Sequence, residues 1–144
     1  MDLRTEYPRS MRVKLAGYIH VARMIDKARS KTAGTLGEYI YPCPMDDRFL
    51  EFTGLNADEF QAVASTRPDE AVAAWVRERA KPHSQAEIDQ WNEMMLARGP
   101  ATDEKRAYFN QMRDSIDPSR TDITAWANLL DLDEKRPVPK RTGG

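Results

Sequence analysis

The amino-acid sequence predicts an all-α protein, a compact single-domain bundle of about seven short helices with an irregular loop near residues 33–44. Three observations support this fold class. After Tyr18 the apolar residues recur at the i, i+3, i+4, i+7 spacing of a helix nearly everywhere along the chain. Several segments begin with residues typical of helix N-termini. The length of 144 residues, with 40% hydrophobic and 31% charged residues, fits one soluble globular domain.

The predicted helices follow from this apolar spacing and lie near residues 18–32, 45–53, 57–66, 68–80, 85–98, 103–115 and 122–132. The helix at 57–66 has clear signals at its start. Asn56 is an N-cap with Glu59 three residues later, and Leu55 can pack on Phe60 as a hydrophobic staple. Gly54 is expected to end the helix before it.

The helix at 85–98 is delimited at both ends. Ser84 and Glu87 form the capping-box motif "SQAE" at its start. Gly99 is expected to adopt the left-handed conformation that terminates a helix, and Pro100 cannot continue the helix because it lacks a backbone N–H.

Apolar stripes on these helices are expected to form the core. Each Trp lies on such a stripe, and this placement favours packing over ligand binding. The predicted core residues are Met45, Phe49, Phe52, Val72, Trp75, Val76, Ile88, Trp91, Met95, Phe109, Met112, Ile116, Ile123, Trp126, Ala127 and Leu130.

Charge is distributed unevenly, although the net charge is only −1. Residues 1–31 contain eight basic and three acidic residues, which leaves +5, whereas residues 32–60 contain one basic and six acidic residues, which leaves −5. A basic segment next to an acidic one predicts internal pairing as readily as an anionic partner. No recognition helix or RNP-like aromatic pair accompanies the basic residues, so nucleic acid is disfavoured as a partner.

The two ends of the chain differ from its middle. We expect residues 1–17 to be the basic N-terminal arm of one helical domain that spans residues 1–133. Residues 134–144 combine prolines, glycines and basic residues after the last apolar stripe, and this composition predicts a mobile basic tail.

Composition also indicates a cytoplasmic protein. No apolar run approaches the roughly 20 residues needed to span a bilayer, so no membrane partner is expected. The N-terminal stretch "MDLRTEYPRSMRVKLAGY" lacks the apolar segment of a secretory signal. A single cysteine cannot form an internal disulfide, which is typical of a reducing compartment.

Polar chemistry is concentrated in the stretch "RMIDKARSKTAGTLGEYIYPCPMDD". Projected at 100° per residue, its helix divides into an apolar arc and a polar arc, and the polar arc contains His20, Arg23, Lys27 and Lys31. Arg29 falls inside the apolar arc, where an unpaired guanidinium would be too costly. We therefore predict that Arg29 bridges to Glu38 or Asp46.

Two further features of this stretch have ordinary explanations. The segment "GTLG", Gly34 to Gly37, is typical of a turn, because it lacks the preceding strand and the Gly-Lys-Ser/Thr ending of a phosphate-binding loop. Cys43 precedes a helix, which favours thiolate. However, Pro44 removes one N–H, and Asp46 and the residue after it oppose thiolate, so we predict a buried, unreactive thiol.

No motif for a cofactor or a metal is visible. The two histidines, His20 and His83, lie in no HxxxH, HExxH or CxxC arrangement. We therefore expect no metal site and no cofactor.

The segment "YPRSMRVKLAGYIHVARMIDKARSKTAGTLGEYIYPCPMDDRFLEFTGL" resembles the opening of the bacterial proteins grouped as domain-of-unknown-function family 5069. The most specific motifs are "RMIDKAR" and "GEY" followed by "CPMD", and the likeness continues more weakly into "AAWVRERA" and "EIDQWNEMM". The resemblance implies a small bacterial cytosolic protein and carries no activity with it.

The sequence is best interpreted as a binding module with a polar, anion-binding surface around residues 20–47, because an open patch demands fewer coincidences than a catalytic pocket. A small anionic ligand or a protein is the expected partner. Two alternatives stay open: a small enzyme with a pocket at Arg29, Glu38, Tyr39 and Cys43, or a helical protein that forms homo-oligomers. The candidate site residues are His20, Arg23, Asp26, Lys27, Arg29, Glu38, Tyr39, Tyr41, Cys43 and Asp46.

Overall fold

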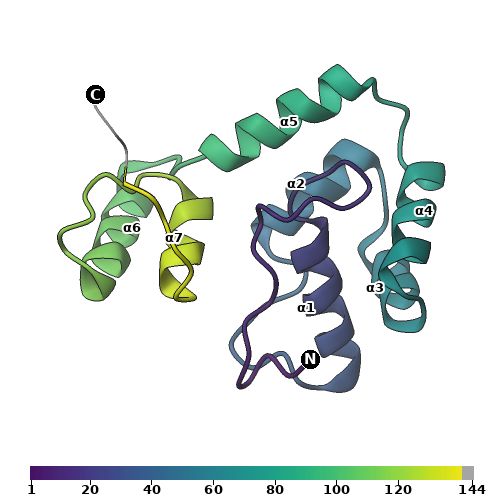
Figure 1. Cartoon of the computed structure of the whole chain (residues 1–144), viewed down its shortest axis with the longest axis horizontal. Coiled ribbons are helices and arrows are strands. Elements are labelled where there is room, and N and C mark those ends of the chain that lie inside the picture. Colours follow the sequence, from purple (N-terminus) through teal and green to yellow (C-terminus); the bar gives the residue numbers. More distant parts are fainter. Residues whose placement is uncertain (141–144) are drawn as a thin grey trace. The chain divides into compact units, whose positions relative to one another are not determined.

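The fold is all-α, as the sequence predicts. The computed structural model describes residues 1–140, and in that range it contains seven α-helices and one isolated β-bridge (Figure 1). The helices are α1 (Val21–Ala33), α2 (Pro44–Thr53), α3 (Ala57–Thr66), α4 (Asp69–Arg79), α5 (Gln85–Ala97), α6 (Asp103–Ile116) and α7 (Trp126–Asp133). Within the described range, no helix is both long enough and apolar enough to cross a membrane.

The chain divides into two compact units at a boundary inside α5. The first unit, Met1–Gln90, contains α1 to α4, and the second begins at Trp91 and contains α6 and α7. A single domain over residues 1–133 stays a prediction, as does the mobility of the tail. Residues 141–144, the end of that tail, lie outside the described residues.

The helix caps form as expected. Asn56 accepts hydrogen bonds from the backbone N–H groups of Asp58 and Glu59 at 2.9 and 3.0 Å. Ser84 N donates to Glu87 Oε1 at 2.9 Å, and Glu87 N donates to Ser84 Oγ at 3.1 Å. Both helix starts predicted from local motifs are therefore confirmed, because the bonds that define them join residues only two or three positions apart.

Two helices begin later than the apolar spacing predicts. α1 begins at Val21 because His20, its N-cap, has a left-handed φ of 74°. α7 begins at Trp126, since Ile123 lies in a turn that its N–H closes onto the carbonyl of Arg120 at 3.0 Å. Apolar spacing shows which residues are buried, and residues in the turn before a helix can be buried too. The pattern can therefore begin before the helix does.

The prediction that Gly99 adopts a left-handed conformation is wrong. The glycines with positive φ in the described range are Gly17, Gly34, Gly37 and Gly54. A Cβ atom at residue 99 would lie 2.6 Å from the carbonyl oxygen of Thr124. Glycine is required there for close approach of two backbone segments, not for backbone conformation.

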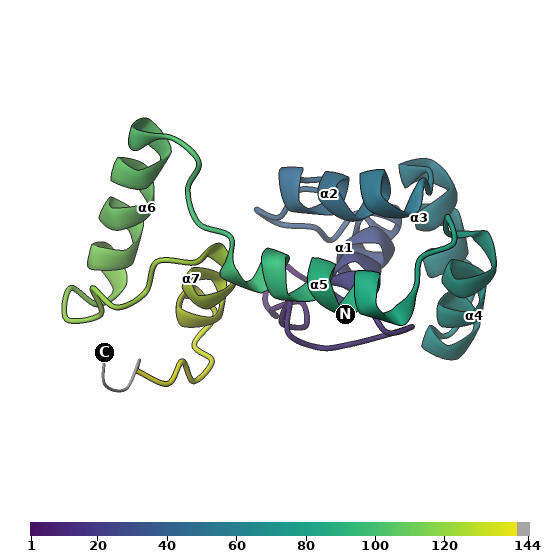
Figure 2. The same cartoon turned by 90° about the horizontal axis from the view of Figure 1, so that it is seen from above.

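The core of the first unit is a chain of aromatic rings. α1 packs against α3, and α3 packs against α4, which lies beside it in both views (Figures 1 and 2). Phe49 of α2 meets Tyr18 edge-on, with ring centroids 5.4 Å apart, and lies 6.1 Å from the ring of Phe60 in α3. Phe60 in turn lies 6.2 Å from the ring of Trp75 in α4. These rings link α2, α3 and α4 to the start of α1.

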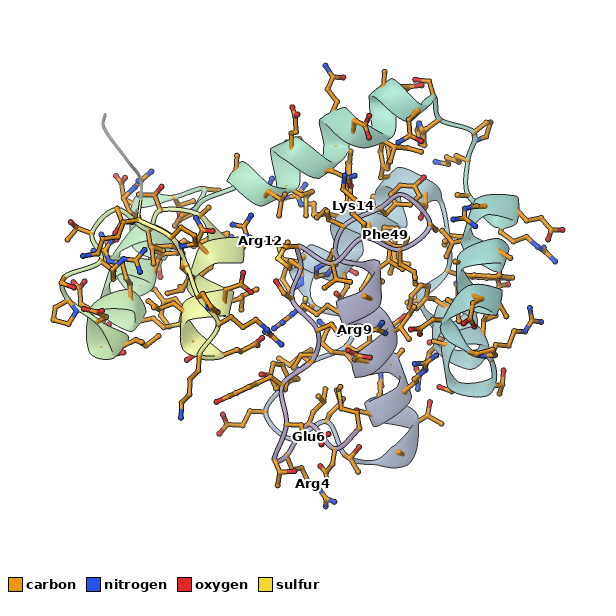
Figure 3. All side chains as sticks on the ribbon, viewed as in Figure 1. Arg4, Glu6, Arg9, Arg12, Lys14 and Phe49 are labelled. Carbon is orange, nitrogen blue, oxygen red and sulfur yellow. The ribbon has the colours of Figure 1, made fainter. Side chains whose placement is uncertain are left out.

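The N-terminal arm packs onto this unit. Leu3 and Met11 are buried, and Leu3 N donates to Thr35 O at 3.0 Å. Gly37, with φ of 62°, comes so close to this segment that a Cβ would lie 2.9 Å from Leu3 O. The segment "GTLG" is therefore a turn that closes on the N-terminal arm, as its composition suggests. The arm carries the charged side chains labelled in Figure 3, which are Arg4, Glu6, Arg9, Arg12 and Lys14.

The second unit has its own small core. Phe109, Ile123 and Leu129 are buried together, and Trp126 packs edge-on against Phe109 with ring centroids 4.9 Å apart. Leu130, a predicted core residue, is only partly buried, whereas Leu129 beside it is buried. The prediction that Ile116 lies in the core is wrong, because its side chain is exposed. The other predicted core residues that are only partly buried are Met45, Phe52, Trp75, Ile88, Met112 and Trp126.

Candidate functional site

His20 and Asp46 form a buried pair at the start of α1. His20 is 1% exposed and Asp46 is 0% exposed, and His20 Nε2 lies 2.6 Å from Asp46 Oδ1. The backbone places the imidazole here: His20 N donates to Met11 O at 2.8 Å, and His20 O accepts from Met24 N at 3.0 Å. A left-handed conformation is uncommon for a residue with a Cβ, and histidine tolerates it better than most.

Lys27 lies about two helical turns after His20 in α1, and its side chain reaches the same carboxylate. Its ammonium lies 2.7 Å from Asp46 Oδ2, 3.1 Å from Ile40 O and 3.2 Å from Cys43 Sγ. The side chain is 3% exposed, so these contacts replace its hydration. His20, Lys27, Cys43 and Asp46 are called the enclosed cluster below.

Asp46 is ionised in this cluster. Burial by itself raises the pKa of a carboxyl, but the hydrogen bond from His20 and the charge of Lys27 outweigh burial and hold the pKa of Asp46 well below its usual range. The carboxylate also accepts from Cys43 N at 2.9 Å, so Cys43 and Asp46 form a capping box at the start of α2.

His20 is therefore the donor in its bond to Asp46. Burial lowers the pKa of His20, which favours the neutral ring. A neutral ring facing an ionised carboxylate must carry its proton on Nε2, and this leaves a lone pair on Nδ1. His20 Nδ1 is buried and has no hydrogen-bond partner within residues 1–140.

Cys43 is half-buried and is a free thiol. Its sulfur faces the Lys27 ammonium at 3.2 Å and lies at the N-terminal end of α2, where the amide of Asp46 closes the other half of the capping box. Both neighbours are donors. The sequence predicts that Asp46 opposes a thiolate. In the structure, however, the charge of Asp46 is offset by its contacts with His20 and Lys27. The sequence predicts low reactivity of this thiol, whereas the contact with the Lys27 ammonium favours a reactive one.

A row of cations runs along α1 beneath the loop that leads to α2. Arg23 lies with its guanidinium carbon 5.6 Å from the ring centre of Tyr39, and Lys31 Nζ lies 5.8 Å from that of Tyr41. Lys31 Nζ also donates to Tyr41 O at 3.0 Å. This polar arc is closed to solvent for most of its length, because Arg23 and Lys27 are each 3% exposed.

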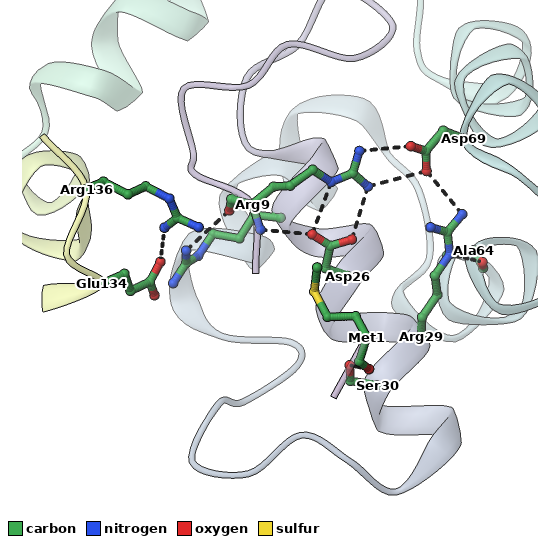
Figure 4. Close-up of polar contacts among 10 residues, drawn as sticks. Met1, Arg9, Asp26, Arg29, Ser30, Ala64, Asp69, Glu134 and Arg136 are labelled. Carbon is green, nitrogen blue, oxygen red and sulfur yellow. Dashed lines mark hydrogen bonds and ion pairs between the residues drawn. The ribbon is translucent and has the colours of Figure 1, made fainter. Parts of the chain in front are cut away.

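The prediction that Arg29 pairs with Glu38 or Asp46 is also wrong. Its guanidinium lies 3.1 Å from Asp69 Oδ1 and donates to the carbonyl oxygen of Ala64 at 2.8 Å (Figure 4). It also donates to the carbonyl oxygen of Arg67 at 3.0 Å. Asp69, the first residue of α4, lies forty positions further along the chain. Sequence proximity was the wrong guide to the partner, because α3 brings α4 to this side of α1.

Arg9 joins Asp69 to α1. Its guanidinium donates to Asp69 Oδ2 at 2.8 Å and to both oxygens of Asp26 at 3.1 Å, and Arg9 N donates to Asp26 Oδ2 at 2.9 Å (Figure 4). The hydrogen bonds from Arg9 hold the pKa of Asp69 below its ordinary value. Arg9, Asp26, Arg29 and Asp69 are called the bridging network below.

The candidate residues are thus divided among different surroundings. His20, Lys27, Cys43 and Asp46 meet in the enclosed cluster, Arg23, Tyr39 and Tyr41 adjoin it, and Asp26 and Arg29 belong to the bridging network. Glu38 is exposed. Arg9 and Asp69 were missed, and only the basic excess of the N-terminal arm hinted that an arginine there would need acidic partners.

A shallow groove of about 530 Å³ lies elsewhere in the first unit, between the Lys14–Gly17 turn and α4. It is lined by Asp69, Glu70 and Arg77 from α4, so both charge signs are present. Within residues 1–140, no three His, Cys, Asp or Glu side chains are grouped as metal ligands.

These features define an all-α protein whose first unit encloses a Cys, Lys, Asp and His cluster. The chain belongs to the family described as a domain of unknown function (DUF5069), whose model matches residues 5–136. A search of curated proteins finds no match. The family description names no activity, and bacterial origin and a cytoplasmic location stay predictions.

Proposed function

We propose that this protein is a binding module that holds an anionic ligand against the cationic row of α1, beside residues 38–43. One observation carries the proposal. Lys31 is exposed, and within residues 1–140 its ammonium contacts the carbonyl and the ring of Tyr41 but no carboxylate. An ammonium that contacts only neutral groups still attracts an anion. An ammonium in an ion pair attracts a second anion much less, because the carboxylate already offsets its charge.

The surroundings of Lys31 add to this attraction. Lys27 lies one turn earlier on the same side of α1, and its charge is neutralised by Asp46, so no carboxylate is left over from that pair to repel an anion at Lys31. Tyr39, half-buried above Arg23, supplies a ring edge and a hydroxyl for a planar or tetrahedral oxoanion. A carboxylate or phosphate group of a small molecule suits this surface.

The enzyme alternative receives less support. It required Arg29, Glu38, Tyr39 and Cys43 to converge, but Arg29 contacts Ala64 and Asp69 whereas Cys43 contacts Lys27. Homo-oligomer formation stays a prediction, which sedimentation of the purified chain can test.

Titration with inorganic phosphate, followed by amide chemical shifts in two-dimensional NMR, tests the proposal. We expect saturable shifts at residue 31, at residues 38–41 and at residue 43, and these shifts should weaken as salt is raised. Lys31→Gln should weaken apparent affinity several-fold, whereas Lys105→Gln removes an exposed lysine of α6 and should leave affinity unchanged.

Two results would contradict anion binding at this surface. One is a set of phosphate-induced shifts spread over lysines and arginines throughout the chain. The other is equal affinity in Lys31→Gln and the unmodified protein.

A further inference from the structure

The side chains of Cys43 and Lys27 are in direct contact, and together they could react with an oxidant. Cys43 Sγ and Lys27 Nζ are 3.2 Å apart, and Lys27 is held in place by Asp46 Oδ2 and Ile40 O as well. Cys43 is a half-buried residue, whereas Lys27 is 3% exposed. A partly accessible nucleophile therefore touches an amine that solvent hardly reaches.

Two common reactions of an oxidised cysteine have no partner within this chain. A sulfenic acid normally condenses with a second thiol or with a backbone nitrogen. The chain has no second cysteine, and the residue after Cys43 is Pro44, whose nitrogen carries no hydrogen. The Lys27 amine is the nitrogen nucleophile already in contact with the sulfur.

We propose that Cys43 and Lys27 form a modification site for hydrogen peroxide, in which oxidised Cys43 is captured by Lys27 as a covalent sulfur–nitrogen bond. The site would link α1 to the N-terminus of α2 through side chains 16 positions apart. It does not rest on the anion-binding proposal, because the reaction needs the contact between Cys43 and Lys27 and not a bound anion at Lys31.

The reaction balances in two steps. The Cys43 thiolate attacks one oxygen of the peroxide, so that a sulfur–oxygen bond forms, the oxygen–oxygen bond breaks and hydroxide leaves. The sulfur loses two electrons and the peroxide gains them. The Lys27 ammonium gives a proton to that hydroxide and becomes a neutral amine.

The amine then attacks the sulfenic sulfur. A nitrogen–sulfur bond forms, the sulfur–oxygen bond breaks, and the departing hydroxide takes a proton from nitrogen to leave as water. One thiol, one amine and one peroxide thus yield one sulfenamide and two waters. Two equivalents of an external thiol would reverse the change, restoring Cys43 and Lys27 and forming one disulfide of the reagent.

The bond would also change the enclosed cluster. A neutral sulfenamide nitrogen cannot pair with the Asp46 carboxylate as the ammonium does, so Asp46 would be left as a buried charge with His20 as its remaining side-chain partner. Oxidised protein should therefore unfold at a lower temperature than reduced protein.

Intact-mass analysis of the folded full-length chain after treatment with a small excess of hydrogen peroxide tests the proposal. We expect the mass to fall by about 2 Da, the loss of two hydrogens, and the change to be reversed by dithiothreitol. Proteolysis should yield one peptide pair that joins the Cys43 and Lys27 segments.

Two lysine variants separate this reaction from general oxidation. Lys27→Arg keeps a cation beside Asp46 and removes the amine, so it should gain oxygen at Cys43 and form no linked peptide. Lys31→Arg changes a neighbouring lysine in the same way and should still lose about 2 Da. Circular dichroism of Lys27→Arg verifies that its result comes from a folded chain.

Three results would overturn the proposal. They are sulfinic or sulfonic acid at Cys43 with Lys27 unlinked in the unmodified protein, a linked peptide that involves another lysine, and retention of the linkage in Lys27→Arg.

Discussion

The two polar groups attached to α1 differ in access to water, although they contain similar residue types. In the enclosed cluster the side chains of Lys27 and Asp46 are 3% and 0% exposed. In the bridging network those of Arg29 and Asp69 are 35% and 34% exposed. Water screens the second pair and not the first, so similar distances correspond to different energies. The comparison teaches that an ion pair cannot be weighed by its length alone.

The largest expected effect is that of breaking the enclosed cluster. Lys27→Met leaves the Asp46 carboxylate buried without its cation and should lower the free energy of unfolding by about 3 to 5 kcal/mol. Urea denaturation measures the loss. The double variant Lys27→Met with Asp46→Leu should recover part of it, because no unpaired charge remains. A loss below about 1 kcal/mol in the single variant would place the cluster in the same class as a surface pair.

The second effect is a pH dependence from His20. The unfolded chain binds a proton at His20 near pH 6.5, whereas burial lowers the pKa of His20 in the folded protein. Stability should therefore be complete above pH 6.5 and fall as pH drops below it, by at most about 1.4 kcal/mol per pH unit. Asp46 adds to the loss only at lower pH, because its carboxyl must be protonated in the unfolded chain first.

Urea melts between pH 7.5 and 5 measure this dependence. His20→Asn suits the left-handed backbone and should flatten the slope, while His83→Asn retains His20 and should retain the slope assigned to it. An equal slope in His20→Asn and the unmodified protein would show that another group titrates.

The third effect concerns the bridging network. Arg29→Met should lower the free energy of unfolding by about 1 kcal/mol, because water can solvate Asp69 and the Ala64 and Arg67 carbonyls once the guanidinium is removed. Raising salt should shrink this loss, while the loss in Lys27→Met should stay nearly constant. Equal salt responses of the two variants would contradict the difference in screening.

The smallest effect is expected at the exposed pair of Arg4 and Asp2, which lie 2.9 Å apart in the N-terminal arm. Arg4→Gln should leave the urea midpoint unchanged within error, because an exposed pair gains little over its hydrated ions. A midpoint shift comparable to that of Arg29→Met would reveal a role for the arm that this pair alone does not explain.

Local sequence sufficed wherever the deciding contacts lie within one or two helical turns. The Asn56 cap and the Ser84 and Glu87 capping box join residues two or three positions apart, so their motifs determine them. The prediction of a left-handed Gly99 is wrong because the residue is needed for its close approach to Thr124, which lies 25 positions further along the chain, and local motifs carry no information about that contact.

The candidate site could be located from the sequence but not assembled. Four of the ten candidates meet in the enclosed cluster, three of them from the polar stretch between Arg23 and Asp47 and the fourth, His20, from just before it. Helical projection placed Lys27 on a polar arc and so toward water. It could not anticipate that the residues from Ile40 to Asp46 would cover that arc.

By itself the sequence determined the helices, their caps and the separation of a basic arm from an acidic segment, because each depends on neighbours along the chain. Only the tertiary structure decided which acid each cation meets. Arg29 pairs with Asp69, although Glu38 is nearer in sequence. Asp46 pairs with Lys27 and not with Arg29. The physical reason is that charge pairing depends on distance in space and on access to water, and both are set by how α2 and α4 pack around α1.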